Sequence, residues 1–340
     1  MLLIISLKFL FCAVIIVISG YQLSGYSDII AEKTGLSRTW IGVLLLASVT
    51  SLPELATGIS SVTIAGAPDI ALGNIMGSNL FNLLIIALLD FLHGPSPIFS
   101  KAHRGHIISA GFGIILVSMA TISIFIYSSM DGGGLSIGNI GLYTPIIFLV
   151  YLLSMRAVYS FEKKQMLEST EETQEPLLYK EVSLRGVYIK FLIHSLVIVG
   201  TGIWLPIIGL QFAEVTGLGE TFVGNIFIAL STSFPELVVC ISAFKIGAID
   251  LAIGNVLGSN LFNVGMLAID DIFYIKAPLL AEVSLIHIIP GLATVIITGI
   301  VIVGLIYRSE KKVFMRISWD ALSIVVIYIL NAYLLYIFRM

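Results

Sequence analysis

Residues 69–82 read DIALGNIMGSNLFN, and residues 250–263 read DLAIGNVLGSNLFN. The two stretches are identical at ten of fourteen positions. A second matching pair lies upstream of them, TSLPEL at residues 50–55 and TSFPEL at residues 232–237. Self-similarity of this kind indicates that the chain is built from two copies of one structural unit.

The composition around these repeats is typical of a membrane protein. Of 340 residues, 58% are hydrophobic and 11% are charged, and the mean hydropathy is +1.04. A helix needs about 20 mostly apolar residues to cross the hydrocarbon core of a bilayer. We therefore predict an all-α integral membrane fold with ten transmembrane helices, at residues 2–20, 38–64, 69–92, 105–128, 136–158, 188–213, 219–244, 250–274, 281–307 and 316–338.

The two copies are predicted to have opposite orientations in the membrane. A hydrophilic segment at 159–187, read as a cytoplasmic linker, divides the chain into five-helix repeats at 1–158 and 188–340. Because five spans separate corresponding points, the second copy enters the bilayer from the opposite side. Inverted repeats are typical of secondary transporters, whose substrate site lies near the midplane where the repeats meet.

The positions of the basic residues predict the orientation of the chain. Fifteen of the eighteen Lys and Arg residues fall on the odd-numbered connections between spans. Cytoplasmic loops carry an excess of Lys and Arg, so both termini are expected outside the cell. The chain is expected to be a multi-pass protein of the cell membrane.

Other partners are not indicated by the sequence. Cys12 and Cys240 both fall inside predicted spans, so neither a disulfide framework nor a cysteine metal site is expected. No basic stripe or nucleic-acid motif appears, and no obligatory protein partner is evident. The lipid bilayer and the transported ions are the expected partners.

Two glutamates, Glu54 and Glu236, lie deep inside apolar spans. A carboxylate at the bilayer centre costs several kcal/mol, and ionisable residues at this depth usually mark an ion path. No Lys or Arg lies in the middle of a predicted span. A bound cation is therefore the expected counter-charge.

A proline precedes each glutamate. Pro53 and Pro235 remove a backbone hydrogen bond and are expected to kink their helices, exposing carbonyl groups in the preceding turns, at 47–50 and 229–232. Exposed carbonyls beside hydroxyls and a carboxylate form an all-oxygen shell. Such a shell suits hard cations such as Ca²⁺ and Na⁺, whereas Zn²⁺ or copper would require Cys or His.

The spans that follow carry polar residues at intervals of four. Residues four apart share one face of a helix, so Asn74, Ser78 and Asn82 are expected to point in one direction. Their counterparts in the second copy are Asn255, Ser259 and Asn263. Asn and Ser also join membrane helices by hydrogen bonds, and this alternative stays open, above all for Asn74, Asn79, Asn255 and Asn260.

Several remaining polar residues have structural interpretations. Asp69 and Asp250 open their spans and are predicted to be N-caps. Asp90, Asp270 and Asp271 lie near predicted outer span ends, where they could attract cations, and solvated ends explain them equally well. Interfacial placement is the expected role of His93, His103 and His106, with a pH sensor as the alternative.

The duplicated Thr-Ser-Leu/Phe-Pro-Glu, followed by Gly-Asn-x-x-Gly-Ser-Asn-x-x-Asn, resembles the alpha repeats of the sodium/calcium exchanger family, within the calcium/cation antiporter superfamily. The resemblance covers essentially the whole chain, and short prokaryotic members also lack a large regulatory domain. It implies a secondary active antiporter without a cofactor that exchanges Ca²⁺ for Na⁺ by alternating access. The ligands that it implies are side-chain or carbonyl oxygens of Glu54, Glu236, Thr50, Thr232, Ser51, Ser233, Ser78, Ser259, Asn82, Asn263, Ala47 and Ala229.

Two departures from the family pattern leave the counter-ion open. Val49 and Ser231 stand where the family usually has Gly, and Asn82 and Asn263 are both amides, whereas many sodium/calcium exchangers have one Asp there. A proton/calcium antiporter is the alternative, although its usual Gly-Asn-x-x-Glu motif does not match Thr-Ser-x-Pro-Glu. An intramembrane enzyme or a structural membrane protein is a further alternative. No zinc-protease motif or nucleophile elbow favours an enzyme.

Overall fold

The computed structural model describes residues 2–33, 47–129, 135–168, 182–309, 311–313 and 316–338, and within these the chain is predominantly helical. The α-helices are α1 (Leu2–Lys33), α3 (Leu52–Ser60), α4 (Pro68–Leu92), α5 (His106–Ser129), α6 (Tyr143–Glu168), α7 (Leu184–Thr216), α8 (Glu220–Phe222), α9 (Ala229–Thr232), α10 (Phe234–Lys245), α11 (Ile249–Phe273), α12 (Ile288–Tyr307) and α13 (Trp319–Ile337). Single-turn elements are the π-helices η1 (Ser61–Ala65) and η3 (Val223–Ile228), and the 3₁₀ turns η2 (Ile98–Ser100), η4 (Leu279–Ala281) and η5 (Leu285–His287). A short antiparallel hairpin joins β1 (Ser136–Ile137) to β2 (Ile140–Gly141).

Within the described residues, eight helices are long and apolar enough to cross a membrane. A ninth candidate is the pair Glu220–Thr232 and Phe234–Lys245, which is bent by 44°. The predicted span at 38–64 lies partly outside the described residues, and its described part contains α3 and η1. The structure is thus a multi-pass helical fold, and the count of ten remains a prediction.

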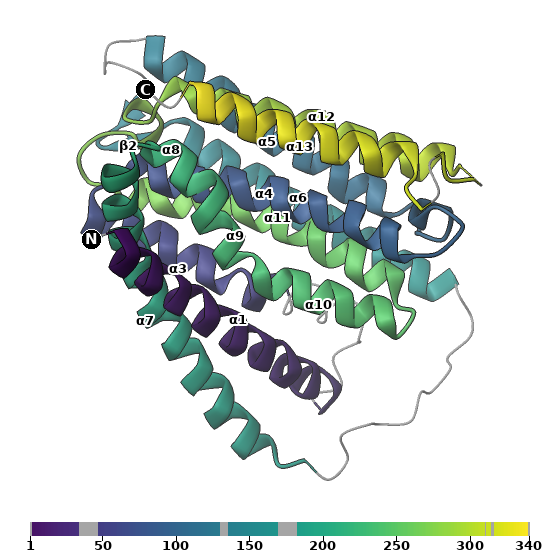
Figure 1. The fold of residues 1–340 in the computed structure, drawn as a ribbon. Coiled ribbons are helices and arrows are strands. Elements are labelled where there is room, and N and C mark those ends of the chain that lie inside the picture. Colours follow the sequence, from purple (N-terminus) through teal and green to yellow (C-terminus); the bar gives the residue numbers. More distant parts are fainter. Residues whose placement is uncertain are drawn as a thin grey trace.

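Two long helices form the centre of the bundle. In α4 and α11, 78% and 83% of the most apolar window is buried by other parts of the protein. The outer helices α5, α12 and α13 pack on one side of this pair, and α1 and α7 lie together on the other side (Figure 1). Both ends of the chain lie at the same end of the bundle (Figure 1).

The spans that carry the glutamates are broken at the predicted places. Ser51 has φ −86° and ψ 10°, and Ser233 has nearly the same angles, φ −89° and ψ 6°. Pro53 and Pro235 follow within the first two residues of α3 and α10, where proline is tolerated because its missing N–H would be unpaired anyway. The break predicted from each proline is therefore present in both copies.

Some predicted boundaries are wrong. The fifth span begins at Tyr143 and not at 136, because the β1–β2 hairpin occupies residues 136–141. Its helix continues to Glu168, into the segment predicted to be a linker. The first helix likewise continues to Lys33, with an apolar portion at Leu2–Leu23.

Candidate functional site

The structure brings the two repeats together at the two glutamates. The hydroxyl of Ser51 donates to Glu236 Oε1 at 3.0 Å, and the hydroxyl of Ser233 donates to Glu54 Oε1 at 2.8 Å. Ser78 adds a weaker donor to Glu54 at 3.4 Å. Each glutamate is thus held by the serine that precedes the proline of the opposite repeat.

The threonines and alanines of the broken turns lie beside these pairs. The Ala47 carbonyl accepts from Thr50 Oγ1 at 3.2 Å, and the Ala229 carbonyl accepts from Thr232 Oγ1 at 3.2 Å. The Thr232 hydroxyl also donates to Asn74 Oδ1 at 3.0 Å. Asn74 Nδ2 donates in turn to the backbone carbonyl of Glu54 at 3.4 Å. Asn74 therefore joins the two broken helices.

The central amides are oriented by the opposite repeat. Asn82 Nδ2 donates to Asn260 Oδ1 at 3.0 Å, and Asn263 Nδ2 donates to Asn79 Oδ1 at 3.1 Å. Asn260 Nδ2 donates in turn to the backbone carbonyl of Asn79 at 3.1 Å. Asn79 and Asn260 thus hold helices together, as the alternative interpretation of these two residues expected.

These bonds leave a set of acceptor oxygens without partners. All twelve residues of the predicted ligand set are buried, with at most 5% of each exposed. The buried side-chain oxygens of this set that lack a hydrogen-bond partner are Glu54 Oε2, Glu236 Oε2, Asn82 Oδ1, Asn263 Oδ1 and Ser259 Oγ. Buried acceptors are normally satisfied, so this group of oxygens has the chemistry of a hard-cation site. No cluster of three or more His, Cys, Asp or Glu that could hold a metal occurs in the described part of the chain.

The prediction that Asp69 and Asp250 are N-caps is wrong. Asp69 accepts from Ser284 N at 2.7 Å and from His287 Nε2 at 2.9 Å. Asp250 accepts from His103 N at 2.7 Å and from His106 Nε2 at 3.0 Å. The contacts are equivalent in the two repeats, and each ties the start of one central helix to the other repeat.

The solvated placement predicted for Asp90, Asp270 and Asp271 is also wrong, since all three are at most 1% exposed. Asp90 accepts from Ile98 N at 2.8 Å and Ser318 N at 3.0 Å, and Lys312 Nζ lies 3.7 Å from it. The donors to Asp271 are Leu279 N at 2.6 Å, Gly141 N at 3.0 Å, the Tyr143 hydroxyl at 2.5 Å and the Thr144 hydroxyl. The carboxyl groups of Asp90 and Asp271 thus stabilise the turns that follow α4 and α11 by accepting backbone hydrogen bonds from them.

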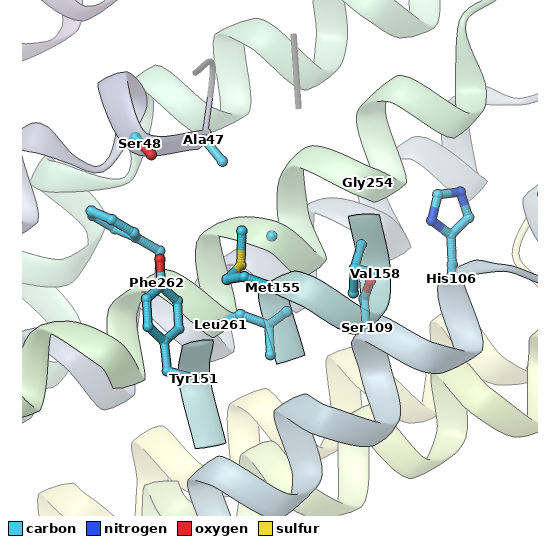
Figure 2. A pocket seen from close by; sticks show the side chains of 11 residues that line it. Ala47, Ser48, His106, Ser109, Tyr151, Met155, Val158, Gly254, Leu261 and Phe262 are labelled. Carbon is cyan, nitrogen blue, oxygen red and sulfur yellow. The ribbon is translucent and has the colours of Figure 1, made fainter. Parts of the chain in front are cut away.

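A small cavity lies beside Ala47, one of the twelve candidate ligand residues. Its volume of about 30 Å³ exceeds the ~10–15 Å³ that one water requires. Figure 2 shows it between α5, α6, α11 and residues 47–48. The lining residues are Ala47, Ser48, His106, Ser109, Tyr151, Met155, Val158, Gly254, Gly258, Leu261 and Phe262.

Sequence reasoning missed the bonds between the repeats that hold these carboxylates. Asp69 and Asp250 are 181 positions apart, and His106 and His287 have the same separation. The quoted repeat already pairs Asp69 with Asp250, and extending the comparison beyond it would have paired His106 with His287. Asp90 and Asp271 follow the same spacing.

The comparison with known proteins agrees with this architecture. The family model described as sodium/calcium exchanger protein matches residues 5–159 and 188–338. The chain belongs to this family. It is therefore an ion antiporter of the membrane and not an enzyme.

Among curated relatives, the sodium/calcium exchanger MaX1 of Methanosarcina acetivorans is 26% identical over 329 residues, covering 88% of this chain and 89% of the relative. The inner membrane protein YrbG of Escherichia coli is also 26% identical, over 74% of each chain.

Two solved structures share the fold. The sodium-calcium exchanger NCX_Mj aligns with a TM-score of 0.61 and 21% identity, covering 97% of this chain and 98% of the other. The H⁺/Ca²⁺ exchanger CAX aligns with a TM-score of 0.70 and 14% identity, covering 98% and 85%. At these identities the likeness concerns the fold alone.

Proposed function

We propose that the chain exchanges Ca²⁺ for Na⁺ by alternating access, at a site formed by the twelve residues predicted from the sequence. The observation that carries the proposal is the set of unpartnered oxygens on Glu54, Glu236, Asn82, Asn263 and Ser259. Ca²⁺ takes six to eight oxygen ligands, and carbonyls and hydroxyls at the two helix breaks could complete such a shell.

The charge of the site fits a divalent cation or two monovalent ones. Glu54 and Glu236 supply two carboxylates inside the protein, and burying an uncompensated charge is costly. One Ca²⁺ or two Na⁺ would balance them. The amides of Asn82 and Asn263 offer dipoles but no further charge.

The helices α1 and α7 are the proposed moving elements. They pack on each other and cross the two broken spans at glycines. A Cβ at Gly20 of α1 would lie 2.3 Å from Pro235 Cγ, and a Cβ at Gly202 of α7 would lie 2.7 Å from Ala56 Cβ. At these glycines no side chain of α1 or α7 interlocks with the broken spans. This packing would allow α1 and α7 to slide past a core formed by α3, α4, α10 and α11, which would expose the site to each side of the membrane in turn.

The cavity in Figure 2 supports an access path. It lies at the end of the bundle where α5 and α11 begin, which the distribution of basic residues predicts to be cytoplasmic. In the first repeat, a Cβ on Gly77 of α4, the equivalent of Gly258, would lie 2.1 Å from the Asn225 carbonyl oxygen, so α4 and η3 are in close contact there. We propose that both termini are outside and that this conformation is open towards the cytoplasm.

Two findings favour sodium over protons as the counter-ion: the Thr-Ser-x-Pro-Glu motif and the similarity to the sodium/calcium exchanger MaX1. The structural likeness to the H⁺/Ca²⁺ exchanger CAX, together with amides at both central positions, supports the proton as the second candidate.

The test is Ca²⁺ uptake into proteoliposomes driven separately by a Na⁺ gradient and by a pH gradient. Uptake with the Na⁺ gradient at equal pH is expected. If the pH gradient drives uptake and the Na⁺ gradient does not, Na⁺ is rejected as the coupling ion. Absence of cation flux under both gradients would reject calcium antiport.

A further inference from the structure

Asp270 in α11 is a buried carboxyl group without a polar partner. It is 1% exposed, and neither Oδ1 nor Oδ2 has a hydrogen-bond partner in the described structure. The adjacent Asp271, by contrast, accepts four hydrogen bonds. An ionised, unpaired carboxylate in such surroundings is far more costly to bury than a neutral acid, so Asp270 requires a bound positive species.

The carboxyl group of Asp270 packs against the backbone of α3. A Cβ at Gly58 would lie 2.5 Å from Asp270 Oδ2 and 2.8 Å from Oδ1. Gly58 is one turn after Glu54, and Asp270 is two turns after Asn263. At 1.5 Å per residue, Asp270 lies about 10 Å along α11 from the central amide. It is close to the proposed cation site without belonging to it.

The neighbouring charged groups do not neutralise Asp270. The basic groups on the described elements packed against α11 lie towards its start, away from Asp270: His106 of α5 contacts Asp250, Arg156 of α6 follows Met155 at the cavity beside Gly254, and Lys245 ends α10 four residues before α11 begins. The other titratable groups near α11 are acidic or phenolic and supply no positive charge: Glu54, Glu236, Asp69, Asp90, Tyr127, Tyr143, Tyr151 and Glu282. Lys276, just beyond the helix, lies over the Tyr274 ring at 5.9 Å from its centroid. No ion pair to Asp270 is present among the described residues.

We propose that Asp270 binds a proton at a site separate from the two-glutamate site, and that it releases this proton when a cation occupies that site. The inference rests on the proposed cation antiport. A single carboxyl group offers too few oxygens for Ca²⁺, which takes six to eight, but a proton needs only one. A cation about 10 Å away repels the proton and compensates the carboxylate that remains.

The release step breaks the O–H bond of Asp270 and transfers the proton to water at the end of the bundle formed by β1, β2 and η4. The helix α7 covers α3 next to this point, since Ser60 Oγ donates to the Gly202 carbonyl at 2.9 Å. The proposed sliding of α7 would uncover α3 beside Gly58. The proton would then reach water during the same movement that exposes the cation site.

The test is infrared difference spectroscopy of the full chain in lipid nanodiscs, recorded with and without Ca²⁺. We expect Ca²⁺ to remove the carbonyl band of a protonated carboxylic acid in the unmodified protein. Asp270→Asn should lack this change, whereas Asp320→Asn should retain it. Asp320 is a matched control because it is also buried, at 2% exposure, but lies at the start of α13.

Calorimetry in buffers of different ionisation enthalpy adds a count of protons released per bound Ca²⁺. We expect Asp270→Asn to bind Ca²⁺ and to release one proton fewer than the unmodified protein. Asp270→Leu is the second variant, because Leu89 occupies the equivalent position in α4.

Equal proton counts in the unmodified protein and either Asp270 variant would overturn the proposal. If neither variant folds, the unmodified protein decides alone, since the absence of any Ca²⁺-sensitive carboxylic acid band would also overturn it. Proton release that depends on Asp270 in a protein that fails to couple Ca²⁺ to Na⁺ would support the proton site while rejecting the proposed counter-ion.

Discussion

The central helices α4 and α11 are two copies of one element, and one buried acid, Asp270, occurs only in the second copy. Asp90 and Asp271, at equivalent positions, both accept the backbone N–H eight residues later. The residue before each differs: Leu89 is part of the apolar core, and Asp270 is an unpartnered carboxyl group. The residues at equivalent positions contribute to the fold and to the proposed cation site, whereas the proposed proton site exists in the second repeat only.

A second difference lies at the first polar position of each helix. Asn74 Oδ1 accepts a hydrogen bond from Thr232, whereas Asn255 Oδ1 has no partner in the described structure. Asn255 instead directs its amide nitrogen at Cys240 Sγ, 3.6 Å away. The cavity also lies on the α11 side, at Gly254 and Gly258. The two repeats therefore have similar sequences but different contacts around the proposed site.

The largest effect is expected at the two glutamates, which occupy equivalent positions in the two repeats. Glu54→Gln and Glu236→Gln should each lower Ca²⁺ exchange by about 100-fold, corresponding to about 2.7 kcal/mol, because each removes half of the carboxylate charge. The measurement is ⁴⁵Ca²⁺ uptake into proteoliposomes. Glu282→Gln, at an exposed position outside the site, is the charge-matched control, and wild-type rates in either site variant would refute the proposed ligand set.

Replacing the shared structural acids should destabilise the protein without removing ligands. Asp271→Asn and Asp90→Asn should each cost about 2–4 kcal/mol, since an amide nitrogen would face donors that a carboxylate now satisfies. Thermal unfolding in detergent would measure the loss. Unfolding midpoints equal to that of the Glu282→Gln control would show that these hydrogen bonds do not stabilise the turns.

A smaller effect is expected at the contact that exists in one repeat only. Gly58→Ala should cost about 1–3 kcal/mol, because the added methyl group collides with Asp270. Asp270→Ala should remove most of this cost in the double variant, so the two changes would be strongly non-additive. Additive losses in unfolding experiments would place the Asp270 side chain away from Gly58.

The smallest effect compares the two Asp–His pairs. The side chains of His287 and Asp69 are 0% and 24% exposed, whereas those of His106 and Asp250 are 12% and 55% exposed. His287→Ala should therefore cost about 1–2 kcal/mol and His106→Ala about 0.5 kcal/mol. Unfolding midpoints in the reverse order would contradict this difference between the two ends of the bundle.

The predicted site illustrates what a duplicated sequence can reveal. Thr-Ser-x-Pro-Glu implies a broken helix beside a buried carboxylate, because proline interrupts the backbone hydrogen bonds and the apolar span fixes the depth. Residues spaced by four, such as Ser78 and Asn82, must share a helix face. The family matched by the chain agrees with this interpretation, and the assignment of the individual ligands remains a proposal.

Local sequence by itself determined the helical membrane fold, the two copies and the helix breaks, because hydropathy, periodicity and proline act over neighbouring residues. Only the tertiary structure decided which polar groups have partners. The bonds from Ser51 to Glu236 and from His287 to Asp69 join residues 185 and 218 positions apart, so no local pattern encodes them. The same reason separates Asp271 from Asp270: adjacent in sequence, they point to different neighbours, and one finds four donors while the other finds none.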